Sequence, residues 1–110
     1  MELRNKLVFH IPEKAWQQDH LEDIDVDFAV GKLAQSLNNA GTDSFYTQEV
    51  IGCYKGRHYP ERLMVVFCDD ADKATDLADI FKRWFRESNG VLRQEAFSYE
   101  LNGALFVEEL

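Results

Sequence analysis

The segment 63–68 constrains the fold of this chain more than any other. It places six apolar residues in a row, Leu-Met-Val-Val-Phe-Cys, directly before Asp69 and Asp70. A strand with one face in water alternates apolar and polar residues, and this segment does not alternate. We therefore expect a strand that is covered on both faces.

A second apolar strand is predicted near the start of the chain, at Lys6–Ile11, and Pro12 is expected to end it. Side chains of a strand point alternately to its two faces. One face of this strand then carries Leu7, Phe9 and Ile11, and the other carries Val8 and His10.

Two helices are predicted. The first begins at Asp25 or Asp27, either of which can cap it, and runs to about Ala40, with Gly41 ending it. The second begins after Asp69 and Asp70 and closes at Asn89-Gly90. Apolar residues recur at helical spacing in both, at Ala29, Leu33, Leu37 and Ala40 in the first and at Ala74, Leu77, Ala78, Phe81, Trp84 and Phe85 in the second.

The remaining segments predict further strands and turns. Residues 45–54 form a strand whose polar residues and Gly52 indicate an edge position, and Lys55-Gly56 turns it toward 63–68. Residues 94–101 and 104–107 pair through a hairpin at Asn102-Gly103, which sets Tyr99 opposite Phe106 and Leu101 opposite Ala104. The polar stretch 13–25, anchored by Trp16 and Leu21, is expected to contain a short helical turn.

The predicted order is strand, helix, strand, strand, helix, strand and one added hairpin strand. This is the split βαββαβ order of the ferredoxin-like fold, an antiparallel α+β sheet with two helices on one face. We expect one such domain over residues 1–110. In that fold the first and third strands lie in the centre of the sheet, and here they are the two most apolar strands.

The helices are expected to cover either Leu63, Val65 and Phe67 of the central strand or the opposite set. With the first set covered, which is the expectation carried forward, the face without helices has Val8 and His10 beside Met64, Val66 and Cys68. An apolar patch of this kind is usually covered by another segment of the chain or by a partner protein. We expect a homodimer that packs through this face about a twofold axis. The alternative is a monomer in which the segment 13–25 folds over the sheet.

Composition and charge limit the possible binding partners and the cellular compartment of the protein. The formal net charge of −8 opposes binding to nucleic acid or to an anionic membrane. No apolar run is long enough to cross a bilayer or to form a signal peptide, so a cytoplasmic location is expected. There, Cys53 and Cys68 are expected to be free thiols.

Two groups of residues are candidates for a site. His10 is a candidate acid or base on the open face, and His58 and Tyr59 are further catalytic candidates. The turn before the central strand is locally basic and is predicted to bind a small anionic ligand. Its candidate ligand-binding residues are Lys55, Arg57, His58, Tyr59 and Arg62. Each of these also has a structural interpretation, as an interface histidine or a solvated loop.

No metal site and no cofactor is predicted. The segment Asp23–Asp27 resembles only the start of a calcium loop, and its acids also suit the start of a helix. No zinc spacing, phosphate-binding glycine loop or nucleophile elbow is present. An RNA-recognition module is also disfavoured, because the expected open face lacks aromatic residues on its two central strands.

Three functions remain open. The leading interpretation is a non-enzymatic cytoplasmic homo-oligomer that acts as a binding or regulatory module. The second is a small enzyme of the dimeric α/β-barrel type, using His10 with Tyr59 or His58 on a small organic acid or aromatic substrate. The third is an acidic DNA mimic, which requires the acids to form a continuous band.

Overall fold

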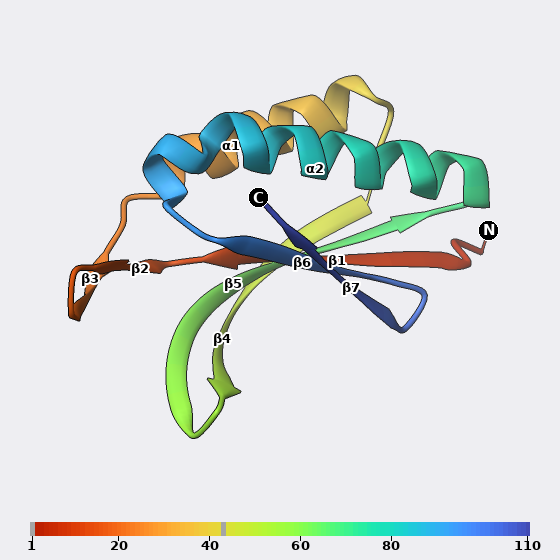
Figure 1. Cartoon of the computed structure of the whole chain (residues 1–110). Coiled ribbons are helices and arrows are strands. Elements are labelled where there is room, and N and C mark those ends of the chain that lie inside the picture. Colours follow the sequence, from red (N-terminus) through yellow and green to blue (C-terminus); the bar gives the residue numbers. More distant parts are fainter. Residues whose placement is uncertain (1, 43) are drawn as a thin grey trace.

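The computed structural model describes residues 2–42 and 44–110. It forms one five-stranded antiparallel sheet in the order β4-β5-β1-β6-β7, with two helices on one face and a separate small hairpin, β2-β3 (Figure 1). The strands are β1 (Asn5–Pro12), β2 (Lys14–Gln17), β3 (His20–Asp23), β4 (Ser44–Tyr54), β5 (Arg57–Cys68), β6 (Ala96–Leu101) and β7 (Ala104–Glu109). The helices are α1 (Asp27–Asn39) and α2 (Ala71–Leu92). The predicted α+β class is confirmed.

The two most apolar strands lie side by side in the middle of the sheet, as predicted. β1 runs antiparallel to β5, with Val8 opposite Val65 and His10 opposite Leu63. β4 and β7 form the edges. The central position follows from sequence, because a strand without polar alternation needs neighbours and cover on each side.

The prediction of which β5 residues lie on the open face was wrong. Met64, Val66 and Cys68 are buried in the core that faces the helices, together with Leu7, Phe9 and Ile11. The open face instead carries Leu63, Val65 and Phe67 beside Val8 and His10. A continuous apolar strand does not reveal its register, and a shift of one residue exchanges its two faces.

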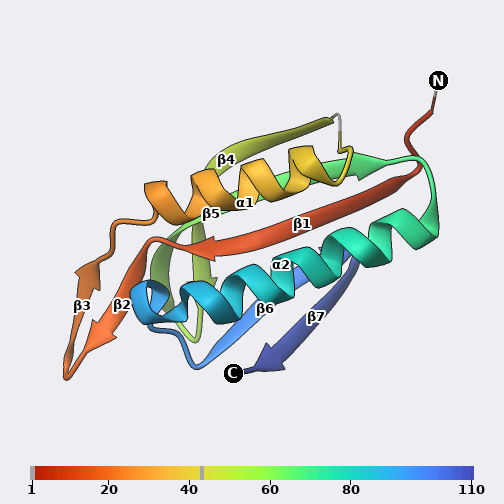
Figure 2. The ribbon, with the colours of Figure 1, turned by 90° about the horizontal axis from the view of Figure 1, so that it is seen from above.

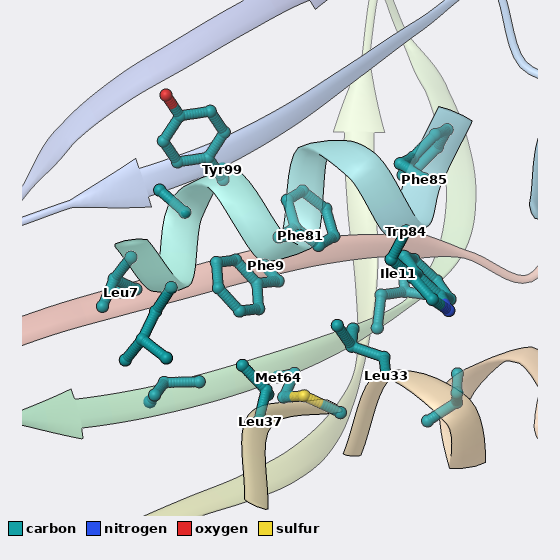
Figure 3. Packing of buried hydrophobic residues seen from close by; sticks show 14 of the residues in the cluster. Leu7, Phe9, Ile11, Leu33, Leu37, Met64, Phe81, Trp84, Phe85 and Tyr99 are labelled. Atoms are coloured by element: carbon teal, nitrogen blue, oxygen red, sulfur yellow. The ribbon is translucent and has the colours of Figure 1, made fainter. Parts of the chain in front are cut away.

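The core lies between the sheet and the two helices, which run next to each other above it (Figure 2). Phe81 of α2 stacks on Phe9 of β1, with ring centroids 4.3 Å apart and planes 1° apart. Trp84, Phe85 and Tyr99 surround this pair, and Met64, Leu33 and Leu37 complete it from the other side (Figure 3). The predicted apolar stripe of α2 is therefore confirmed.

The end of α2 was predicted two to three residues too early. The helix continues through Gly90 to Leu92, and Arg93 adopts the left-handed conformation, φ 53°, that ends it. Asn89 has a different role, because its side-chain amide donates to the Gln94 carbonyl (3.1 Å) and its Oδ1 accepts from the Gln94 N–H (2.9 Å). Leu92 is fully buried, and burial of this last turn outweighs the cost of a glycine inside the helix.

α1 agrees with prediction along its length but not at its ends. It begins after Val26, without a side-chain cap on its first turn, although Asp25 Oδ1 accepts a hydrogen bond from the Asp27 N–H at 3.2 Å. Ala29, Leu33 and Leu37 are buried as expected, whereas Ala40 is exposed beyond the helix. Gly41 ends the segment with φ +83°.

Residues 13–25 form a β-hairpin and not a helical turn. β2 pairs with β3, and Trp16 lies opposite Leu21. Figure 1 shows this hairpin beyond the end of β1, away from the centre of the open face. The local sequence is too short and polar for its strand alternation to be recognised.

Both predicted turns are confirmed, at Lys55-Gly56 and at Asn102-Gly103, where all four residues have positive φ. The pairs Tyr99–Phe106 and Leu101–Ala104 are also as expected. Cys53 and Cys68 are free thiols, the first exposed and the second buried. Across residues 2–42 and 44–110, neither helix is both long and apolar enough to cross a membrane.

Candidate functional site

The open face of the sheet holds His10 between two glutamates. His10 Nε2 lies 2.9 Å from Oε2 of Glu100, and His10 Nδ1 lies 3.7 Å from Oε2 of Glu61. The side chains of His10, Glu100 and Glu61 are 23%, 35% and 33% exposed. They are therefore partly shielded and still accessible to a ligand. We call these three residues the Glu–His–Glu cluster.

Sheet register builds this cluster from three strands. Glu61 of β5 lies opposite Pro12, and Glu100 of β6 lies opposite Val8. Both are therefore on the same face as His10 and diagonal to it, within reach of long side chains. Because the three positions are distant in sequence, only the pairing of β1 with both neighbours brings them together.

The carboxylates change the acid–base behaviour of the histidine. Glu61 raises the pKa of His10 most, partial burial opposes this effect, and Glu100 raises the pKa further. The net result is a pKa above the ordinary value of 6.5. The contact with Glu100 is shorter than that with Glu61, and both lie within ion-pair range, so each carboxylate stabilises the imidazolium form.

A hollow of about 70 Å³ opens beside His10. β1 and β6 are paired only from Leu7 to Phe9, so the strands are no longer joined beside His10 and Ser98. Glu61, Gln94, Ala96 and Ser98 line the hollow together with His10. A reacting group that entered it would meet His10 and Glu61 directly.

A larger groove of about 570 Å³ adjoins this hollow. Trp16, Tyr54 and Tyr59 supply its aromatic lining. Gln94 and Ala96 line both spaces, so the groove and the hollow are neighbours. We refer to the larger space as the aromatic groove.

The basic turn does not form one site. Arg57 lies over the Trp16 ring, 5.4 Å from its centroid, and Tyr59 lines the aromatic groove. Lys55 occupies the turn itself, next to the ring of Tyr54. His58 is on the other face of the hairpin, where its Nδ1 lies 3.7 Å from the sulfur of Cys53. Strand alternation divides these residues between two faces, and binding of a small anion there stays a prediction.

Arg62 is held by two acidic side chains and has a structural role. Its guanidinium contacts Glu13 at 3.1 Å and Asp27 at 3.0 Å, so it joins the start of α1 to the segment before β2. Its pKa is raised by these two acids, against partial burial. The arginine is thus engaged by acids and turned away from the Glu–His–Glu cluster.

The acidic segment Asp23–Asp27 likewise has protein partners. Asp23 contacts Lys14 at 3.0 Å, and Asp27 contacts Arg62. In the part of the chain that the structure describes, no three His, Cys, Asp or Glu residues are grouped in a way that could hold a metal ion. These acids serve local structure.

Sequence reasoning found His10 and missed the importance of its partners. Neither Glu61 nor Glu100 is among the candidate site residues that the sequence singled out. A charged residue inside the apolar strand Phe97–Leu101 was the available signal. Trp16 was noted as an anchor, but its approach to Tyr59 depends on the curvature of the β4-β5 hairpin.

Comparisons with known proteins give a likeness of fold. No family model matches the chain, and no curated protein matches it. A solved structure titled as a phage SAM lyase in complex with S-methyl-5'-thioadenosine superposes with a TM-score of 0.60 at 10% sequence identity, covering 96% of this chain and 89% of that one. An apo phage SAM lyase gives a TM-score of 0.49 at 13% identity with the same coverage. The first of these supports the α+β architecture.

Proposed function

We propose that this protein is a small enzyme that uses His10 as a general base on a nucleoside-type sulfonium substrate, of which S-adenosylmethionine is the example. The observation that carries the proposal is the position of His10, held between Glu61 and Glu100 beside a hollow on the open face. The likeness of fold to a SAM lyase suggests the substrate class. A non-enzymatic module would have no need for this partly shielded pairing of a histidine with two carboxylates.

The cluster suits the removal of a proton next to a breaking carbon–sulfur bond. In such an elimination, the imidazole of His10 takes the proton, the carbon–hydrogen electron pair forms the new double bond, and the carbon–sulfur pair leaves with the neutral thioether. The two carboxylates stabilise the imidazolium that results, which makes His10 a stronger base. Their negative charge also attracts a cationic substrate.

The architecture supports this proposal at the level of fold only. The strand order β4-β5-β1-β6 is the order expected of a ferredoxin-like sheet, with β7 added at the edge. Folds of this kind carry many functions, so the site and not the fold must decide the reaction. Free thiols at Cys53 and Cys68 suit a reducing compartment, and we place the protein in the cytoplasm.

We also propose that two copies pack through the open face. Tyr46, Leu105 and Val107 are exposed there, between 51% and 65%, beside the half-buried Leu63 and Phe67. A monomer seldom leaves such apolar residues together in water without a partner. A second copy would enclose the Glu–His–Glu cluster and shield it from solvent.

Incubation of the protein with S-adenosylmethionine, followed by mass spectrometry of the adenosine-containing products, tests the function. We expect S-methyl-5'-thioadenosine to form, and His10→Gln to slow its formation by about 10²- to 10⁴-fold. Lys6→Gln is the matched control, because Lys6 lies on the same strand and face as His10, at the opposite end. Absence of any product, or an unchanged rate in His10→Gln, contradicts the proposal.

A further inference from the structure

We propose that the aromatic groove is the binding site for the adenine ring of a nucleoside ligand, and that it selects an uncharged nucleoside over a nucleotide. This inference deepens the proposed function and rests on it for the ligand class. It assigns binding and selectivity to residues outside the Glu–His–Glu cluster. Trp16 and Tyr59 are the principal contacts.

The two hairpins that build the groove come from distant parts of the chain. The long β4-β5 hairpin bends away from the helices (Figure 1). Arg57 near the tip of this hairpin contacts the ring of Trp16 in the β2-β3 hairpin. This contact joins the two hairpins and holds the ring of Trp16 in place.

Strand alternation directs the aromatic rings into the groove. Tyr59 and Glu61 are two residues apart on β5, so they share the open face, and Tyr54 also lines the groove. Tyr59 lies opposite Gly52, and the carboxylate of Glu61 packs over that glycine, 3.2 Å from where a Cβ would lie. The groove therefore has Tyr54 and Tyr59 on its β4-β5 side and Trp16 on its β2-β3 side.

The size and lining of the groove match a flat heterocycle. A volume of about 570 Å³ is within the range of small-molecule sites, roughly 300–1,000 Å³. Aromatic side chains stack on a base whatever its hydrogen-bonding pattern, because every base has a π face. Trp16 is 46% exposed and Tyr54 is 64% exposed, so ring surface is available to a ligand.

The two cations that line the groove, Lys14 and Arg93, are already engaged by other side chains. Lys14 contacts Asp23 at 3.0 Å, and Arg93 donates to the side-chain oxygen of Gln17 at 2.6 Å and lies 3.7 Å from Glu22. Glu95 also lines the groove. A phosphate group would therefore meet no unpaired lysine or arginine among the lining residues, whereas a neutral ring and sugar need none.

The groove leads to the reacting groups. Gln94 and Ala96 line both the aromatic groove and the hollow beside His10. A nucleoside whose base lies between Trp16 and Tyr59 can extend its 5' substituent past these two residues toward Glu61 and His10. The base is thus anchored at one end of the site and the reaction takes place at the other.

Fluorescence titration with adenosine and with adenosine monophosphate tests the proposal without requiring catalysis. Trp16 is half-exposed and Trp84 is 6% exposed, so stacking on Trp16 is expected to quench the accessible part of the emission. Adenosine is expected to bind more tightly than adenosine monophosphate. Calorimetric titration of Trp16→Ala and Tyr59→Ala is expected to show each Kd raised by about 5- to 150-fold, since stacking contributes roughly 1–3 kcal/mol per base.

Phe28→Ala is the control, because Phe28 is an aromatic residue of α1 that is 76% exposed and does not line the groove. It should bind adenosine as the unaltered protein does. Loss of binding in Phe28→Ala with unchanged binding in Trp16→Ala and Tyr59→Ala would overturn the assignment, and so would tighter binding of the monophosphate. Trp16→Phe keeps a ring, and its retained binding would separate stacking from loss of folding.

The proposed binding role of the aromatic groove and the proposed reaction can be contradicted independently. Adenosine that binds through Trp16 and Tyr59 while S-adenosylmethionine remains uncleaved would uphold the groove and contradict the proposed reaction. Cleavage with an unchanged KM in Trp16→Ala and Tyr59→Ala would uphold the reaction and overturn the groove. Failure of the unaltered protein to bind adenosine at millimolar concentration also overturns the groove.

Discussion

Glu100 reaches diagonally across the sheet to His10. In the pairing of β1 with β6 it lies opposite Val8, and its carboxylate is nevertheless 2.9 Å from Nε2 of His10. With Glu61 on the other side, this contact links the two central strands and β6 through one imidazole. The acid–base behaviour of His10 therefore depends on the sheet register.

The first prediction concerns the pKa of His10. It is raised above 6.5 by Glu61 and Glu100, against partial burial. We expect Glu61→Gln and Glu100→Gln each to lower it, and the double variant to bring it below 6.5, because burial then acts alone. An NMR titration of the imidazole protons measures these values.

Glu49→Gln is the control for this titration. Glu49 lies opposite Arg62, on the helix-facing side of the sheet, and is not part of the cluster. The His10 pKa should be unaffected by this change. A His10 pKa that is insensitive to both glutamates would show that they do not form the cluster in solution.

The second prediction is that His10 contributes pH-dependent stability. Below 6.5 the imidazole is protonated in the folded and unfolded states, and the two carboxylates stabilise the folded protein fully. As the pH rises through the raised folded-state pKa, the proton is lost and so is this contribution. The difference in free energy of unfolding between the unaltered protein and His10→Gln should shrink from mildly acidic to mildly alkaline pH, measured by urea denaturation. A difference that grows with pH would contradict the predicted direction.

The third prediction addresses the core. Phe81 is fully buried and stacks on Phe9, with Phe85, Phe97 and Tyr99 at its edges. Phe81→Ala should lower the free energy of unfolding by about 3–5 kcal/mol, because it removes this contact and leaves a cavity. Phe28→Ala removes a ring that is 76% exposed and should change it by less than about 0.5 kcal/mol. Equal effects in denaturant titrations would be inconsistent with the packing.

The fourth prediction tests the proposed dimer. Leu105 of β7 is 60% exposed and lies opposite Glu100 on the open face. Sedimentation velocity at micromolar concentration should show a dimer, and Leu105→Glu should shift it to a monomer by placing a charge in the interface. Val91→Glu, on α2, is the control, since Val91 is 49% exposed and lies on a helix. A monomer of unaltered protein would exclude packing through this face.

Local pattern was sufficient where one segment determined its own structure. The turns at Lys55-Gly56 and Asn102-Gly103 follow from residues that tolerate positive φ, and the buried stripe of α2 follows from helical spacing. The same reasoning failed at Asn89-Gly90, because burial of Leu92 extends the helix past a local stop signal. It also failed at residues 13–25, where two four-residue strands are too short to show a period.

The amino-acid sequence alone determined that two apolar strands lie in the centre of an α+β sheet, because residues 7–11 and 63–68 can be buried only there. It also identified His10 as a titratable group on the open face. Only the tertiary structure decided which face of β5 is open and which acids meet His10. The reason is that both depend on strand register and on the curvature of a hairpin, and these are set by contacts between segments far apart in the chain.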